Sequence, residues 1–532
     1  MNADQWPREV RDFRVAVTSK DRALFGGAAR ELRRWMAAGD PHRPIYHFTA
    51  PEGWINDPNG PIYHDGVYHL FYQYRPVYAN GSESGICWGH ASSADLLHWE
   101  DWPVAMWPDS RYDVAGVYSG NTFIDDDGFP CALYTGNVGG HEETYGILAR
   151  STDGWLTWHK HKVMGNEQRP NAASPVHWDA QVWKEGELWQ QLIGGAVGEG
   201  TARRGAAHLW TSPDLEYWTH RGTIAEDHDP RRRYWELPYL VPFGAPDSVP
   251  SNDRAVLMVG AAGNPYWTGT YDRAARRFHP DRREPRFIDQ GFFYCVNPHM
   301  VDDKGPGGAP RRLLHGWVIG ARSPVDTVPY WIGAHSIPRV LELSGDELIQ
   351  RPIPELESLR GPSERQRDLA IAPGTRGYLD QVSGDALELE LTADLSRTSA
   401  HRFGAAVRLS PDGRAARVWY EPASNRIGID RLLGPEQVYA NPAANERREL
   451  QGAADKMQAP RVTAPAGTVH GASGTVTLRI FVDRSVLEVY CGGAALTDRL
   501  YPDPSATGLD LFAEGGVASV KTVSAWPLRG AW

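Results

Sequence analysis

The sequence is poor in several features that mark specialised classes of protein. It contains only 4 cysteines in 532 residues, and no two of them have a spacing that suggests a zinc site or a redox motif. A chain of this length can bury a core without disulfides, so we expect reduced, packed thiols at Cys87, Cys131, Cys295 and Cys491. Basic residues are also in deficit: 55 Lys and Arg against 66 Asp and Glu give a net charge of −11, which disfavours nucleic acids and anionic membrane surfaces as partners.

Long apolar runs are missing as well. The sequence has no window of about 18 apolar residues, so we expect no segment that spans a bilayer. The first 45 residues lack an apolar stretch followed by a small-residue cleavage site. We therefore expect a cytoplasmic protein, with secretion as the alternative if Met1 is not the native start.

The composition is that of an ordered, turn-rich globular protein. Hydrophobic residues make up 41% and charged residues 23%, and 55 Gly and 40 Pro are spread without a repeating tripeptide. The length predicts two or more domains. From about residue 45, short apolar runs such as 67–72 and 188–193 are separated by Gly, Asp, Asn and Pro, which indicates β-strands.

The N-terminal segment has a different pattern. Within residues 20–39, apolar side chains recur at three- and four-residue spacing: Leu24, Ala28, Leu32, Trp35 and Met36. This spacing predicts an amphipathic helix, and we expect a helical N-terminal extension over residues 1–44. Its apolar face either packs across the surface of the main domains or forms a dimer contact.

Three segments repeat a pattern of Ser or Thr, Asp and Trp: SSADLLHW (92–99), STDGWLTW (151–158) and TSPDLEYW (211–218). Their last tryptophans lie 59 and 60 residues apart. A period of this size, with several short strands in each unit, favours the blades of a β-propeller over a sandwich. The alternative is three unrelated Asp-Trp turns in a chain with 21 Trp. Residues 45–350 have room for about five units, so we predict a five-bladed β-propeller there.

The composition changes after residue 350. Residues 351–377 are rich in proline and charge, and we expect a surface linker. Beyond them, apolar and charged positions alternate, as in Leu387, Glu388, Leu389, Glu390 and Leu391. This alternation predicts a two-layer antiparallel β-sandwich over residues 378–532, with the charged positions facing outward. The predicted fold class is therefore all-β, a propeller followed by a sandwich.

Three carboxylates near predicted blade starts are the candidate catalytic groups. Asp57 in WINDPNG precedes a proline, which restricts its backbone to an extended conformation. Glu236 in YWELPYLV and Asp179 in HWDAQVW lie in apolar or aromatic runs, where burial without a cation raises the pKa of a carboxyl group. Each residue alone is explained by a turn or a structural hydrogen bond. Three of them at blade starts change this balance, and two carboxylates about 5 Å apart with a third beside them would support double displacement at a sugar anomeric carbon.

These motifs resemble those of glycoside hydrolase family 32, the invertases, fructanases and fructosyltransferases. The similarity runs through both predicted domains, in HFTAPEGWINDPNGPIY, LFYQYRP, WGHASSADLLHW, VYSGNT, WELP, SIPRVLEL, QRPIPELESL, FVDRSVLEVYCGG and TDRLYP. The resemblance implies a five-bladed propeller catalytic domain and a β-sandwich, in agreement with the strand patterns and the repeat.

The resemblance also implies roles for individual residues. Asp57 matches the nucleophile, Glu236 the acid/base, and Asp179 the transition-state stabiliser. Other residues fall where the family holds the fructosyl ring or beside it: Trp54, Asn56, Gln73, Trp88, Tyr118, Ser119, Trp178 and Tyr294. No metal and no organic cofactor is implied.

Two departures from the family pattern concern the pocket. Leu237 stands where the family has a cysteine after the acid/base, and Trp178 and Ala180 replace the arginine and proline of its Arg-Asp-Pro motif. An indole has one N–H where a guanidinium has five donors, so the substrate preference is left open. Trp178 either stacks a second sugar ring and excludes water, which favours transfer, or packs beside Asp179.

We expect a retaining β-fructofuranosidase that hydrolyses terminal fructosyl bonds of sucrose or fructans. One alternative is a fructosyltransferase acting on levan, inulin or sucrose, including intramolecular transfer to a difructose dianhydride. Another is a non-catalytic carbohydrate-binding propeller. The expected partners are sucrose or a fructan oligosaccharide or polysaccharide, with no nucleic acid, no membrane and a possible homodimer.

Overall fold

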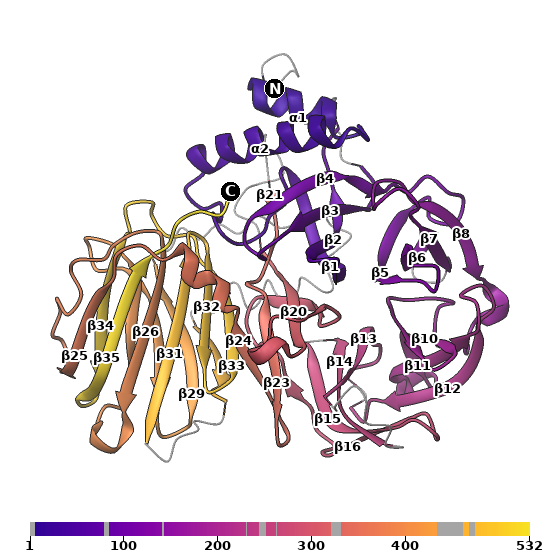
Figure 1. Ribbon diagram of the computed structural model, residues 1–532. Coiled ribbons are helices and arrows are strands. Elements are labelled where there is room, and N and C mark those ends of the chain that lie inside the picture. Colours follow the sequence, from indigo (N-terminus) through magenta and orange to yellow (C-terminus); the bar gives the residue numbers. More distant parts are fainter. Residues whose placement is uncertain are drawn as a thin grey trace.

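Two β modules and a pair of N-terminal helices make up the protein (Figure 1). The computed structural model describes residues 6–78, 84–140, 143–229, 231–243, 252–261, 263–320, 331–433, 461–467 and 474–532. Over these ranges, no helix combines the length and the apolar character needed to cross a membrane. The all-β prediction is confirmed, with a ring of five sheets beside a two-sheet sandwich.

Each propeller blade is an antiparallel sheet whose first strand lies innermost. The first blade contains β1 (Gly53–His64), β2 (Val67–Arg75), β3 (Cys87–Ser93) and β4 (Trp99–Met106). The second contains β5 (Gly116–Ile124), β6 (Pro130–Gly139), β7 (Glu143–Arg150) and β8 (His159–Met164). The third contains β9 (Ala180–Glu185), β10 (Leu188–Val197), β11 (Arg204–Ser212) and β12 (Thr219–Glu226). The fourth contains β13 (Glu236–Pro242), β14 (Asn252–Gly260), β15 (Pro265–Asp272), β16 (Arg277–Pro280) and β17 (Arg286–Phe287). The fifth contains β18 (Phe293–Asn297), β19 (Val301–Asp302), β20 (Arg311–Val318), β22 (Ala334–His335), β23 (Arg339–Ser344) and β24 (Glu347–Pro352), while β21 (Trp331–Ile332) pairs parallel with β1 of the first blade.

The Ser/Thr-Asp-Trp repeat is the turn between the third and fourth strands of the first three blades. Three residues before each final tryptophan the backbone is left-handed, with φ of 68° at Leu96, 77° at Trp155 and 67° at Leu215. In the first blade, Asp95 Oδ1 accepts the backbone N–H groups of Leu97 and His98 at 3.0 and 2.8 Å. The repeat spacing is therefore the spacing of the blades, as predicted.

The sandwich packs two sheets around one apolar core. Its six-stranded sheet contains β25 (Glu364–Ile371), β35 (Ala518–Pro527), β26 (Ala386–Asp394), β31 (Thr475–Asp483), β32 (Val486–Cys491) and β33 (Ala494–Arg499), and its five-stranded sheet β30 (Arg461–Pro465), β29 (Arg426–Leu432), β28 (Ala415–Glu421), β27 (Arg402–Leu409) and β34 (Gly508–Glu514). The leucines of β26 lie in this core, as predicted. However, the expected linker contributes β25 to the sandwich.

Glu388 differs from the prediction that the charged positions of β26 face solvent. Its side chain is fully buried and accepts hydrogen bonds from Arg360 Nε at 2.7 Å and Arg479 Nε at 2.7 Å. The alternation places Glu388 outside the core of the sandwich. The segment that leads into the sandwich covers Glu388 and supplies Arg360. The outer face of β26 is therefore buried at Glu388 by an ion pair.

The N-terminal extension consists of α1 (Arg8–Ala16) and α2 (Arg22–Gly39). The apolar face predicted for α2 is right in part, because Leu32 and Met36 are buried, whereas Leu24 and Trp35 are 54% and 38% exposed. The buried side also contains Phe25, Ala29 and Arg33. Arg33 donates from Nε and Nη2 to both carboxylate oxygens of Asp101 in β4, at 2.7 and 2.8 Å. This buried bidentate pair fixes which side of α2 faces the propeller.

The helices also reach the sandwich. The Arg484 guanidinium donates to the backbone carbonyls of Ala37, Asp40 and Arg43 at 2.8, 3.0 and 3.2 Å. The extension therefore packs across both modules, which is the first of the two roles considered for it.

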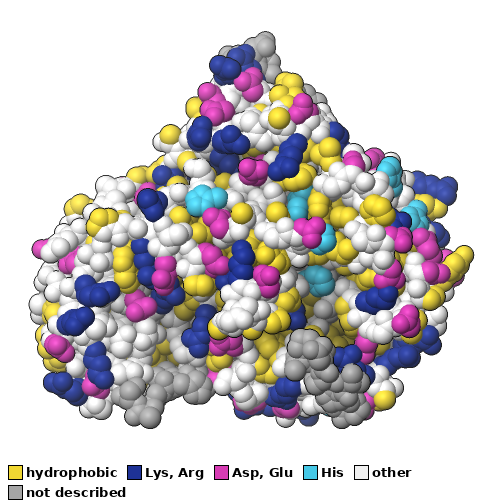
Figure 2. All heavy atoms as spheres, viewed as in Figure 1, with side chains coloured by type: hydrophobic (Ala, Val, Ile, Leu, Met, Phe, Trp, Pro, Cys, Tyr) yellow, Lys and Arg dark blue, Asp and Glu magenta, His cyan; other side chains and the backbone are white. Residues whose placement is uncertain are grey.

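Charged side chains of both signs are interspersed over the face of the molecule shown in Figure 2. Partly exposed ion pairs occur in both modules, such as Arg150 with Asp127 at 2.6 Å and Arg402 with Glu421 at 2.8 Å. On that face, acidic side chains are therefore interspersed with basic ones.

Candidate active site

The inner strands of the propeller bring the three candidate carboxylates together. Asp57 lies in β1, Asp179 directly precedes β9, and Glu236 is the first residue of β13. Burial, followed by the charges of Glu236 and Asp179, raises the pKa of Tyr234. Burial, followed by the charges of Asp179 and Asp57, raises the pKa of Tyr239. Asp179 therefore lies close enough to both tyrosines to influence them. It shares Tyr234 with Glu236 and Tyr239 with Asp57.

The inner strands depart from regular pairing at these residues. Register shifts fall between Ile55 and Pro58 in β1, between Val117 and Gly120 in β5, between Glu236 and Tyr239 in β13, and between Tyr294 and Asn297 in β18. Left-handed backbone occurs at Asp179, Leu237 and Cys295, with φ of 46°, 43° and 50°. Such irregularities re-aim side chains and are common beside active sites. Here they direct polar side chains from several blades toward one region.

Asp57 is buried among neutral hydrogen-bond donors. Its carboxylate accepts the Ser119 hydroxyl at 2.6 Å and the Asn56 side-chain amide at 3.2 Å. Gln73 links these two donors, because its Nε2 donates to Ser119 Oγ at 2.5 Å and its Oε1 accepts Asn56 Nδ2 at 2.7 Å. Burial raises the pKa of Asp57, and hydrogen bonds from Cys295, Ser119 and Asn56 counter part of that rise. The carboxylate is thus held in place by donors that carry no charge.

Glu236 and Asp179 also have hydrogen-bond partners on neighbouring strands. Tyr294 donates its hydroxyl to Glu236 Oε2 at 3.1 Å, and Glu236 is half-buried. Asp179 is 5% exposed, and its backbone N–H donates to Thr135 Oγ1 at 2.9 Å. Across the described ranges, no three His, Cys, Asp or Glu side chains are grouped as a metal site would require.

The eight predicted sugar contacts divide by exposure. Three keep partly exposed side chains: Asn56, Tyr118 and Tyr294. The other five are buried: Trp54, Gln73, Trp88, Ser119 and Trp178. Trp88 is fully buried, and its indole N–H donates to the Tyr118 carbonyl at 3.0 Å. Gln73 and Ser119 therefore support Asp57, and Trp88 supports the backbone of β5.

Trp178 packs in the wall of the site. It is 3% exposed, and its ring meets those of Tyr118 and Tyr234 edge-on, with centroids 5.9 and 6.1 Å away. A side chain this buried offers no free face to a second sugar ring. The structure therefore favours the packing interpretation of the arginine replacement over the stacking one.

Cys295, Thr135 and Tyr234 are site residues that the sequence analysis missed. All four cysteines are free and buried, as expected, and Cys295 is also among the groups that lower the pKa of Asp57 against the effect of burial. Its position next to Tyr294 in FFYCVN is the only signal in the sequence. Adjacent side chains of a regular strand face opposite sides, so this position predicts that Cys295 faces away from Tyr294 and from the site.

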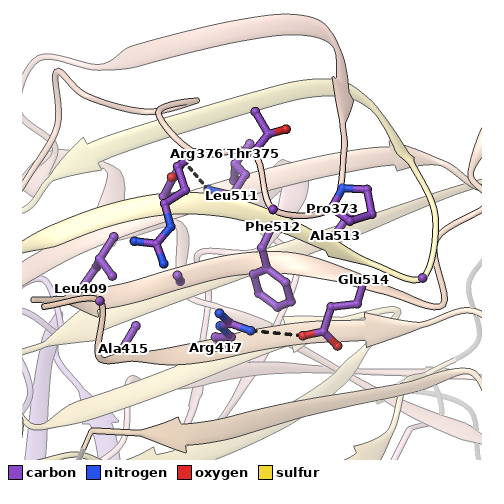
Figure 3. A pocket seen from close by; sticks show the side chains of 15 residues that line it. Pro373, Thr375, Arg376, Leu409, Ala415, Arg417, Leu511, Phe512, Ala513 and Glu514 are labelled. Carbon is purple, nitrogen blue, oxygen red and sulfur yellow. Dashed lines mark hydrogen bonds and ion pairs between the residues drawn. The ribbon is translucent and has the colours of Figure 1, made fainter.

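A groove of about 430 Å³ on the sandwich is another candidate site (Figure 3). Its polar side chains are largely occupied with one another or with the backbone. Arg417 donates to Glu514 Oε1 at 3.2 Å, while Asp510 accepts the backbone N–H groups of Gly377 and Tyr378 at 2.8 and 3.0 Å. These contacts build the groove walls, and we place the candidate active site in the propeller.

Comparisons with known proteins cover both modules of the chain. The models of the glycosyl hydrolases family 32 N-terminal domain and family 32 C terminal match residues 47–352 and 355–527. A levanase of Bacillus subtilis (strain 168) is 33% identical over 525 residues, covering 93% of this chain and 71% of the levanase. Sucrose-6-phosphate hydrolase of Escherichia coli is 27% identical over 92% of this chain and 96% of its own length.

Solved structures share the fold. The crystal structure of fructan 1-exohydrolase IIa from Cichorium intybus has a TM-score of 0.77 at 24% identity, covering 92% of this chain and 98% of that chain. Exo-inulinase from Aspergillus awamori has a TM-score of 0.73 at 24% identity, covering 93% of this chain and 99% of that chain. With both of its modules matched by the family models, the chain belongs to glycosyl hydrolase family 32.

Proposed function

We propose that the protein is a retaining β-fructofuranosidase that hydrolyses terminal fructosyl bonds of sucrose or of fructans. The observation that carries the proposal is the set of Asp57, Asp179 and Glu236 at irregular points of three inner strands, in a chain of family 32. The names of the relatives support this substrate class, because they include a levanase, a sucrose-6-phosphate hydrolase and a fructan 6-exohydrolase of Beta vulgaris.

In the first step, an oxygen of the ionised Asp57 carboxylate attacks the anomeric C2 of the fructosyl unit. The bond from C2 to the leaving oxygen breaks while Glu236 gives its proton to that oxygen. Ser119 and Asn56 hold the attacking carboxylate by their hydrogen bonds. The products of this step are the free leaving group and a fructosyl ester of Asp57.

In the second step, Glu236 accepts a proton from water, whose oxygen attacks C2. The bond from C2 to Asp57 breaks, and fructose leaves with retained configuration. Asp179 stabilises the positive charge that builds up on the sugar ring in both transition states. The neutral donors around Asp57 suit this chemistry, since a fixed cation beside the nucleophile would oppose a cationic transition state.

The test is the release of fructose from sucrose, inulin and levan, assayed separately with products identified by mass spectrometry. We expect free fructose as the product at every acceptor concentration. Asp57→Asn should abolish it, while Asp65→Asn, an exposed aspartate at the turn after β1, should not. Binding of all three sugars without turnover by the wild type would contradict the enzyme proposal. Oligosaccharide or dianhydride products would favour the transferase alternative.

A further inference from the structure

The peptide unit between Trp178 and Asp179 is hydrogen-bonded at both of its polar groups. Its carbonyl oxygen accepts the backbone N–H of Gly194 in β10 at 3.0 Å, and its N–H donates to Thr135 Oγ1 in β6 at 2.9 Å. The first contact lies within the third blade, and the second reaches across to the second blade. Because both groups are bonded, the plane of this peptide is fixed, and the backbone of Asp179 is restrained with it.

The backbone of Asp179 is left-handed, with a φ of 46°. This conformation is uncommon for a residue that has a Cβ, and it persists where the surrounding contacts hold it. The direction of the carboxylate depends on it, because the Cα–Cβ bond of Asp179 turns with the backbone. A contact that fixes the preceding peptide therefore also helps to fix the direction of the Asp179 carboxylate.

Two further side chains support Thr135 from behind. Gln191 Nε2 donates to His177 Nε2 at 2.5 Å, so the neutral imidazole carries its proton on Nδ1 and donates it to Thr135 Oγ1 at 2.9 Å. Burial lowers the pKa of His177 to about 3, which keeps the ring neutral. Thr135, His177 and Gln191 are all fully buried. They form a chain of hydrogen bonds that ends at the backbone N–H of Asp179.

We propose that Thr135 is a positioning residue: with His177 behind it, its hydroxyl oxygen holds the left-handed backbone of Asp179 and so directs the carboxylate that stabilises the transition states. The inference rests on the proposed function, in which Asp179 has that role. It assigns Thr135 and His177 no contact with substrate, because both act through Asp179.

A misdirected stabiliser has a kinetic signature of its own. Asp179 acts in the transition states of both steps, so misplacing it should lower kcat by similar factors on natural substrates and on fructosides with an activated leaving group. Loss of the acid/base differs, because activated substrates need less protonation. KM should change much less than kcat, because the lost interaction is one made in the transition state.

The experiment compares Thr135→Val with Thr135→Ser in steady-state assays on sucrose, or on whichever fructan the wild type cleaves, and on an activated fructoside. Thr135→Val keeps the branched shape but removes the acceptor, and kcat should fall by about 10- to 10²-fold on both kinds of substrate. Thr135→Ser keeps the acceptor and should retain most of the wild-type rate. Circular dichroism checks that each variant is folded.

A double-mutant cycle with Asp179→Asn tests whether Thr135 acts through Asp179. Once the charge of Asp179 is removed, its direction matters little, so Thr135→Val should lower kcat much less in the Asp179→Asn background than in the wild type. Residues that act independently would instead give losses that multiply.

A matched control lies farther out in the third blade. Thr211 in β11 is buried, and its Oγ1 accepts Arg221 Nε at 2.7 Å. Thr211→Val therefore removes the same kind of acceptor two strands away from β9. It should leave kcat unchanged on both substrates.

An unchanged kcat in folded Thr135→Val, a loss confined to natural substrates, or losses that multiply in the double variant would overturn the inference. If Thr135→Val does not fold, Gln191→Leu releases the His177 ring and should give a smaller loss, equal on both substrates. Unchanged rates in that variant then overturn the inference. A wild type that releases no fructose refutes the proposed function instead, so the two failures are distinguishable.

Discussion

Two groups of buried carboxylates in this molecule have different surroundings. At the boundary between propeller and sandwich, Glu488 accepts Arg339 Nη2 at 2.9 Å and faces His47 Nε2 at 3.1 Å. Burial alone would raise the pKa of Glu488, but these two partners lower it to about 2. In the propeller site, Asp57 accepts hydrogen bonds from the neutral side chains of Ser119 and Asn56, and burial raises its pKa.

The difference separates a structural role from a chemical one. A buried charge that is paired with a cation stabilises the fold only while the pair is complete. A buried carboxylate held by neutral donors is costly to the fold but keeps its lone pairs available for reaction. Asp483 extends the structural set, because it accepts the backbone N–H groups of Ile45, Tyr46 and His47 at 2.7, 2.9 and 2.8 Å. This contact ties the FVDRSVLEVYCGG motif to the entry of the propeller.

The largest effect is expected for Asp57→Asn. Turnover should fall by about 10⁴-fold or more, because the amide is no nucleophile. The raised pKa in the folded protein means that the ionised form costs stability at neutral pH. The variant should therefore have a slightly higher Tm than the wild type. Activity within tenfold of the wild type would show that another residue attacks the sugar.

Glu236→Gln should slow sucrose and fructans by about 10²- to 10⁴-fold, because the amide cannot protonate the leaving oxygen. Substrates with an activated leaving group need less protonation and should lose much less. Steady-state rates on both kinds of substrate measure the difference. The exposed Glu187 provides the control variant Glu187→Gln. Equal losses on both substrates would assign the acid role to another group.

On the structural side, Arg339→Met should lower the free energy of unfolding by about 3–5 kcal/mol, because Asp289 and Glu488 lose a buried partner. Urea denaturation measures the loss. The matched control is Arg402→Met, which breaks a partly exposed pair with Glu421 and should cost less than about 1 kcal/mol. The pH dependence of kcat/KM should be the same in both variants. A shift of the acid limb of the pH profile in Arg339→Met would contradict the separation between the structural carboxylates and the propeller site.

As the pH falls, the propeller site should lose activity before the boundary between propeller and sandwich loses its stabilising ion pairs. Activity requires ionised Asp57, whose raised pKa places the acid limb above the ordinary aspartate value of about 3.9. Glu488 has a lowered pKa, so its stabilisation is complete above about 4.3 and is lost as the pH falls toward 2. We expect activity to disappear reversibly at a pH where circular dichroism still reports folded protein. Loss of both signals at one pH would contradict this order.

The smallest effect is expected for Trp35→Gln on the outer side of α2. Trp35 is 38% exposed, while the opposite side of the helix packs on the propeller. The variant should keep its Tm and its mass in light scattering. A lower mass than that of the wild type would instead favour the dimer contact considered for the extension.

Local patterns predicted much of the architecture. The Ser/Thr-Asp-Trp repeat identified the blade period because the same left-handed turn recurs in three blades. Alternation predicted β26 of the sandwich, since a strand shows only one face to a core. The predictions failed where a long-range partner decided the outcome. Arg33 turns α2 toward Asp101, and Arg360 and Arg479 cover Glu388.

By itself, the sequence determined the class of both modules, their order along the chain and the three candidate carboxylates, because strand period, turn residues and motif resemblance are local properties. Only the tertiary structure decided how the site is built. It buried Trp178 in the wall, and it directed the Tyr294 hydroxyl to Glu236 from a bulged segment of β18. The physical reason is that the aim of a side chain in a bulged strand depends on its register with the neighbouring strand, and that register forms only when strands distant in sequence come together.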